Sequence, residues 1–272
     1  MATLFSPTFR ALANEAQFTY EMLGSGATQI RGANYATKGA YFQAFTSLST
    51  GLERIGKLCL MLDYYIETKG RFPDFNALKK LSHNLVLIYQ KSREIVAKRD
   101  AHFTFLGNLE QPIHQRVLSV LSGFAEGDRY TNINLLVGKT GDDPVAVWFA
   151  EVDRVLFGTR VTEARKIKIA NNARLAEKLM GSISHVCHSS ETGSDITSIE
   201  EGSYRTGMFE AVAPHRQLVV LQIIRYWVEL LYDLQHKAQG IGKQEIPFFG
   251  DIFGLFYNDD SYFRSRKTWD KV

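Results

Sequence analysis

Residues 41–66 repeat an apolar side chain every three or four positions over about seven helical turns. The repeating side chains are Phe42, Phe45, Leu48, Leu52, Ile55, Cys59, Met61 or Leu62, and Tyr65. This spacing places them on one face of a single amphipathic helix. A helix of this length buries such a face by packing against other helices. The chain is therefore constrained toward a helical bundle.

A second apolar stripe predicts a helix over residues 76–98, with Asn76 as its cap. Gly70 and Pro73 separate it from the first helix, because proline cannot continue the helical hydrogen bonding. The connection between the two stripes is short, and consecutive helices with short connections usually pack antiparallel. The sequence therefore predicts a long antiparallel helical hairpin.

Further stretches of helical spacing follow along the chain, and no strand-like alternation is sustained. The predicted helices are residues 112–124, 145–157, 162–187, 214–237 and 247–257. Asp143-Pro144 and Pro214 are typical of helix starts, where proline is tolerated in the first turn. The predicted fold class is all-α: a bundle built on the hairpin, with additional C-terminal helices.

The chain reads as a single helical domain, residues 1–272. Its most irregular stretch is residues 189–205, which is rich in Ser, Thr, Gly and acids and predicts a surface loop. If the chain is subdivided at this loop, it consists of a helical unit at residues 1–188 and a C-terminal helical segment at residues 206–272.

Charge and cysteine content exclude several classes of protein. The 32 Lys and Arg residues against 29 Asp and Glu give a net charge of +3, which is less basic than a dedicated duplex binder. Two cysteines are too few for a disulfide scaffold. The most apolar stretch, residues 218–232, is interrupted by Gln222, Arg225 and Glu229, and residues 1–10 lack a signal-peptide pattern. We therefore expect a cytoplasmic protein without a membrane partner.

Neither a cofactor nor a metal is predicted. The sequence Gly-Lys-Thr at residues 138–140 lacks the glycine that a phosphate-binding loop needs five residues earlier, where Ile133 stands. His185, Cys187 and His188 are residue types that bind zinc, but no second ligand pair accompanies them.

Two neighbouring segments carry a recognisable pattern: LERIGKLCLMLDYYIETKGRFP at residues 52–73 and LKKLSHNLVLIYQ at residues 78–90. The pattern residues are Glu53, Lys57, Lys79, Lys80, Ser82, His83, Asn84 and Leu85. This arrangement resembles the HEPN (higher eukaryotes and prokaryotes nucleotide-binding) helical domains over roughly a fifth of the chain. The resemblance implies a helical bundle, frequently dimeric. It also implies a frequent role as a metal-independent ribonuclease in toxin–antitoxin, RNA-processing and antiviral defence systems.

The resemblance also suggests which residues form a site. Arg129 and Asn132, in the sequence GDRYTN, match the arginine end of the family's later motif. The HEPN ribonucleases carry a histidine four to six residues after that arginine, and no histidine follows Arg129 at that distance. An active enzyme would then use Arg129 to stabilise charge and His83 as the general base.

These catalytic candidates have structural alternatives. His83 is also suited to a hydrogen bond that fixes the register of the hairpin, and Arg129 and Asn132 to holding a turn. Glu53 and Lys57 match an ordinary helical ion pair. The aromatic C-terminal segment, residues 248–269, is suited to closing the core, stacking on RNA or docking a partner subunit.

The missing histidine favours a divergent, non-catalytic HEPN-like protein that binds RNA, a nucleotide or a protein partner in a bacterial or phage-related defence or stress system. One alternative is a metal-independent endoribonuclease with a rearranged site. The other is a structural subunit that forms a homo-oligomer or a complex and has no nucleic-acid role.

Overall fold

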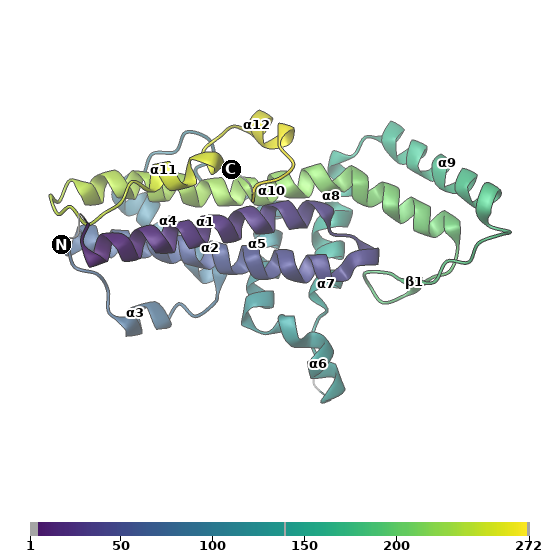
Figure 1. Cartoon of the computed structure of the whole chain (residues 1–272), viewed down its shortest axis with the longest axis horizontal. Coiled ribbons are helices and arrows are strands. Elements are labelled where there is room, and N and C mark those ends of the chain that lie inside the picture. The colour runs from purple at the N-terminus through teal and green to yellow at the C-terminus, as the bar shows by residue number, and fades with distance from the viewer. Residues whose placement is uncertain (1–4, 139, 271–272) are drawn as a thin grey trace.

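The computed structural model describes residues 5–138 and 140–270. Helices make up 73% of the structure and its two strands are short, so the predicted all-α class is confirmed. Figure 1 shows the long helices lying lengthwise beside one another, with α9 along the first part of α10 and α6 projecting from the bundle.

The helices are α1 (Pro7–Gly32), α2 (Lys38–Glu67), α3 (Phe75–Lys79), α4 (Leu85–Arg99), α5 (Pro112–Glu126), α6 (Thr131–Leu136), α7 (Pro144–Trp148), α8 (Arg154–Arg160), α9 (Glu163–Met180), α10 (Ile199–Gln239), α11 (Phe249–Phe253) and α12 (Asp260–Ser265). Short 3₁₀ turns lie at Tyr35–Thr37, Asp128–Tyr130 and Gly254–Phe256, and a π-helical turn at Phe149–Asp153 joins α7 to α8. The strands β1 (His188–Ser189) and β2 (Asp195–Ile196) pair antiparallel.

The antiparallel hairpin of this fold is formed by α1 and α2, which the sequence did not predict as a pair. Gly26 on α1 lies against Leu48 on α2, and Gly51 on α2 lies against Leu23 on α1. The two helices therefore run in opposite directions. A methyl group at either glycine would lie less than 3.0 Å from the opposite side chain. The glycines therefore allow the two helices to approach closely.

The predicted antiparallel hairpin of residues 41–66 and 76–98 is wrong. His83, just before α4, contacts Glu53, whereas Arg99 at the end of α4 donates a hydrogen bond to Asp63 at a distance of 2.7 Å. Residue numbers therefore increase in the same direction along α2 and along α4. The two helices run parallel.

A break inside the predicted second helix explains this direction. Asp74, rather than Asn76, caps the five-residue α3, and Ser82 takes a left-handed conformation with φ of 49°. Asn84 then caps α4 by accepting a hydrogen bond from the Leu87 backbone N–H. The connection therefore returns along α2 before α4 begins, which reverses the expected orientation.

The C-terminal half is organised by α10, a helix of 41 residues that runs lengthwise along the bundle (Figure 1). Ser198 caps it, so the predicted loop at 189–205 ends early and the predicted boundary at residue 206 falls inside a helix. Pro214 lies within α10 rather than in its first turn. Ser190 and Glu191, on the part that remains a loop, are fully buried.

The C-terminal aromatic segment closes the core. The buried side chains are Phe249, Phe253, Phe256, Phe263 and Trp269. They belong to the same cluster as apolar residues of α1, α2 and α10, which agrees with the core-closing interpretation. Within residues 5–138 and 140–270, no helix has the length and apolarity needed to cross a membrane.

A buried histidine makes the stability of this fold depend on pH. Gln222 donates its amide N–H to Asp260, so its carbonyl oxygen accepts a hydrogen bond from Nε2–H of His114 at 3.0 Å. Burial lowers the pKa of His114, and the charges of Arg160 and Arg225 lower it further, against the opposing effects of Gln222 and Asp260. The folded protein therefore disfavours protonation of this imidazole.

We expect acid to destabilise the native chain more than a His114→Gln variant. The unfolded imidazole takes up a proton below its ordinary pKa of about 6.5, whereas the folded one resists protonation, so stability falls as the pH falls. At pH 5.0 this loss is at most about 2 kcal/mol. Urea unfolding of both proteins between pH 7.5 and 5.0 measures it. Parallel losses of stability in the two proteins would contradict the assignment.

Candidate functional site

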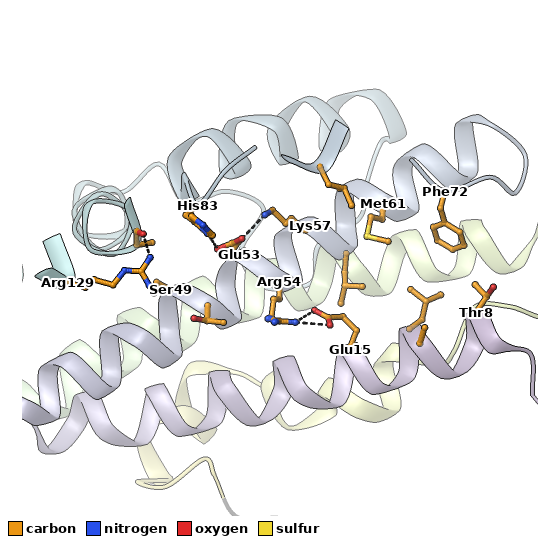
Figure 2. A pocket seen from close by; sticks show the side chains of 16 residues that line it. Thr8, Glu15, Ser49, Glu53, Arg54, Lys57, Met61, Phe72, His83 and Arg129 are labelled. Atoms are coloured by element: carbon orange, nitrogen blue, oxygen red, sulfur yellow. Dashed lines mark hydrogen bonds and ion pairs between the residues drawn. The ribbon is translucent and has the colours of Figure 1, made fainter. Parts of the chain in front are cut away.

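A cavity of about 720 Å³ lies along one face of α2, and we call it the α2 cavity. Its floor repeats at helical spacing through Ser49, Thr50, Glu53, Arg54, Lys57, Leu58 and Met61. Residues of α1 line one side, and residues of α3 and its flanking connection line another. Figure 2 shows the polar side chains of Arg129, His83 and Glu53 toward one end and the ring of Phe72 at the other.

Glu53 links two other polar side chains of the α2 cavity. One carboxylate oxygen accepts a hydrogen bond from Lys57 Nζ at 2.6 Å, and the other lies 2.9 Å from Nδ1 of His83. An ionised carboxylate can only accept, so Nδ1 of His83 carries the proton. Nε2 of the neutral ring is then left as an acceptor, which is the state that a general base requires.

The backbone also holds this group in place. Lys57 Nζ donates to the carbonyl oxygen of Ser82, the residue with the left-handed conformation next to His83. The side chain of Glu53 is 15% exposed and that of His83 is 56% exposed. The carboxylate is thus shielded by its partners, while the imidazole remains open to a ligand.

A second ion pair crosses from α2 to α1. Nη1 of Arg54 donates to both carboxylate oxygens of Glu15, at 2.6 and 2.8 Å, and its guanidinium stacks 4.6 Å from the ring centre of Phe18. Both charged side chains are 38% exposed, so the pair adds little to stability. Its main effect is to neutralise Arg54 within the cavity.

Arg129 lies at the edge of the α2 cavity, in the 3₁₀ turn that follows α5. One guanidinium N–H donates to the carbonyl oxygen of Ala125 at 2.6 Å, and the group lies 5.6 Å from the ring centre of Tyr130. Across residues 5–138 and 140–270, no carboxylate forms an ion pair with it. Arg129 therefore brings a positive charge that is not neutralised by an acid.

Seven further lining residues of the α2 cavity are apolar, and Thr8 adds a hydroxyl: the apolar ones are Ala11, Leu12, Leu58, Met61, Phe72, Leu78 and Ala125. Figure 2 places Met61, Phe72 and Thr8 at the end away from Arg129, where Phe72 also packs against the ring of Tyr65. Such an arrangement is suited to a ligand that combines a flat apolar body with an anionic group.

The structure brings together two of the three residues predicted for the site. His83 and Arg129 line the same cavity, although they are 46 positions apart and come from different elements. Asn132 is exposed on α6 and does not line it. His83 lies in the turn before α4, rather than in the early turns of a helix.

Sequence reasoning missed part of the site. Glu53 and Lys57 form the predicted helical ion pair, but they also line the cavity and contact the 82–83 turn. Glu15 was missed because α1 was not predicted. In the described part of the chain, no three His, Cys, Asp or Glu residues are grouped to hold a metal ion.

Comparison with known proteins gives no match: no family model, no curated protein and no solved structure matches the chain. The HEPN resemblance therefore stays a prediction.

Proposed function

We propose that this chain binds a nucleotide, free or as a unit of single-stranded RNA, in the α2 cavity. The observation that carries the proposal is that His83, its partner Glu53 and Arg129, a cation without an acidic partner among the described residues, line one cavity whose other end carries the ring of Phe72. A nucleotide has the matching chemistry, with a phosphate for the cations and a base for the apolar surface.

The size and charge of the α2 cavity agree with this ligand. Its volume of about 720 Å³ lies within the range of small-molecule sites, about 300 to 1,000 Å³. Three cationic side chains, Arg54, Lys57 and Arg129, face two carboxylates, before any protonation of His83. A phosphate group therefore meets an excess of positive charge, and Phe72 offers a ring on which a base can stack.

A second candidate function is metal-independent cleavage of RNA. Glu53 orients the His83 ring as carboxylates do in catalytic triads, leaving Nε2 to take the proton from a ribose 2′-hydroxyl. The 2′-oxygen would then attack the adjacent phosphorus and displace the 5′-oxygen, which leaves with a proton from solvent water while Arg129 stabilises the developing charge. Asn132 lies outside the α2 cavity, so neither candidate gives it a role.

Incubating the native chain with a mixed pool of single-stranded RNA in EDTA tests both functions. We expect retention of RNA that weakens steeply with salt, because phosphate contacts release counterions. Cleavage in EDTA that disappears in a His83→Ala variant would favour the ribonuclease candidate. Failure to bind both RNA and mononucleotides at low salt would contradict the proposal, and a stable oligomer with that behaviour would support a structural subunit.

A further inference from the structure

A second, smaller cavity of about 230 Å³ lies where α5, α8, α10 and α12 meet, and we call it the α12 cavity. Its polar lining consists of Gln111, Arg160, His215, Gln222, Asp260 and Arg264. None of these residues lines the α2 cavity. Two arginines from distant parts of the chain, one at the end of α8 and one on α12, thus meet at one small site.

The positive charge of the α12 cavity is not balanced by its own acid. The Asp260 carboxylate is engaged by Nη2 of Arg225 at 2.9 Å and by the amide of Gln222 at 2.8 Å. Among the ion pairs of residues 5–138 and 140–270, none involves Arg160 or Arg264. Two guanidinium groups are therefore available to an anion.

The pKa of His215 responds to the positive charges that line the α12 cavity. Burial lowers its pKa, and the charges of Arg264 and Arg160 lower it further. Both arginines therefore act on the same imidazole, as expected when the three side chains converge. A dianion bound among these three side chains would raise the pKa of His215, opposite to the effect of the two arginines.

The start of α5 adds to this field. Gln111 is the N-cap residue and forms no side-chain cap, and Pro112 has no N–H to offer. Gln111 and Ile113 both line the α12 cavity. The positive end of the dipole of this 15-residue helix therefore lies at the wall of the cavity, where it favours an anion.

We propose that the α12 cavity binds a phosphoryl dianion, as free phosphate or as the phosphate group of a small phosphomonoester, through Arg160 and Arg264. Paired guanidinium groups match the geometry and charge of phosphate oxygens. The volume is below the usual range for drug-sized ligands, so the site takes the phosphate group and leaves the rest of the molecule outside. This inference does not depend on the function proposed for the α2 cavity.

Calorimetric titration of the full chain with inorganic phosphate, AMP and adenosine tests the proposal. We expect phosphate and AMP to bind and adenosine not to bind at this site. Arg160→Ala and Arg264→Ala should each weaken phosphate binding on the order of tenfold, through the loss of a charge-assisted hydrogen bond. Arg154→Ala is the matched control, because Arg154 is an exposed arginine at the start of α8 that does not line the cavity.

Nuclear magnetic resonance supplies a second readout that a folding defect would not imitate. Saturating phosphate should raise the titration midpoint of His215 in the native chain and leave it unchanged in the Arg160→Ala, Arg264→Ala double variant. Absence of phosphate binding by the native chain would overturn the proposal. So would equal losses in the Arg154→Ala control, or a loss that appears only in Arg129→Ala, which would place the phosphate in the α2 cavity.

Discussion

Replacing Asp153 with alanine is expected to lower the free energy of unfolding by about 3 to 5 kcal/mol, the usual cost of removing one partner from a buried ion pair. Asp153 is fully buried, and the side chain of its partner Arg216 is 1% exposed. One carboxylate oxygen accepts from Arg216 Nη1 at 3.1 Å and from the Tyr41 hydroxyl at 3.0 Å. The other accepts from the Trp148 indole N–H at 3.1 Å.

Alanine would leave all three donors without this acceptor. The guanidinium of Arg216 also donates to the carbonyl oxygens of Arg31 and Ala33, so it is anchored and cannot easily turn to solvent. Burial, the Asp153 charge and the hydrogen bond to it raise the pKa of Tyr41, despite the opposing charge of Arg216, so its hydroxyl stays protonated. The variant therefore keeps a buried positive charge with no counter-charge.

Chemical unfolding of a small variant series measures this effect. Asp153→Asn should cost less than Asp153→Ala, because it retains an acceptor while losing the charge. The double variant Asp153→Leu, Arg216→Met should recover much of the loss, because it removes both charges. An alanine variant within about 0.5 kcal/mol of the native chain would contradict the ion pair, and the asparagine variant keeps the test available if the alanine variant does not fold.

Replacing Arg129 with alanine is expected to weaken the binding of single-stranded RNA by about tenfold or more. Arg129 lines the α2 cavity without a carboxylate partner among the described residues, so its charge is available to a phosphate. A hydrogen bond between charged groups contributes about 1.5 to 3 kcal/mol, which corresponds to this loss. The logarithm of the binding constant falls linearly with the logarithm of the salt concentration. Losing one phosphate contact should make that slope about 0.7 less steep.

The matched control for Arg129 is Arg154→Ala, which removes an exposed arginine that does not line the α2 cavity. Filter binding at several salt concentrations gives both affinity and slope for each variant. Equal losses in the two variants would show that binding follows overall charge rather than the cavity, and would contradict the assignment of Arg129.

The sequence predicted α2 and α5 because their buried faces carry many large apolar side chains, and it also predicted the mostly polar α9. Residues 41–66 and 112–124 fall inside α2 and α5, and Thr162 caps α9 where a helix start was expected. The helix α1 was not predicted, because small or polar residues such as Ala16, Thr19 and Ala27 interrupt its buried face between larger ones such as Leu23 and Ile30.

The spacing of apolar residues could not predict the direction in which α4 runs. The apolar stripe of residues 76–98 continues through the break at Ser82, so periodicity alone shows one helix where the chain makes two. That break moves His83 beside Glu53, although α4 runs opposite to the predicted direction. The motif identified His83 and Arg129 separately, whereas the cavity that joins them depends on tertiary packing.

The ring signals of the histidines test most directly whether the α2 cavity holds the ligand. A labelled native chain is titrated with a single-stranded RNA tetranucleotide, and the signal of His83 is compared with that of His236, an exposed histidine on α10 outside the cavity. We predict a saturable shift of the His83 signal at RNA concentrations that leave the His236 signal in place. A His83 signal that stays unchanged while RNA is bound would contradict the account.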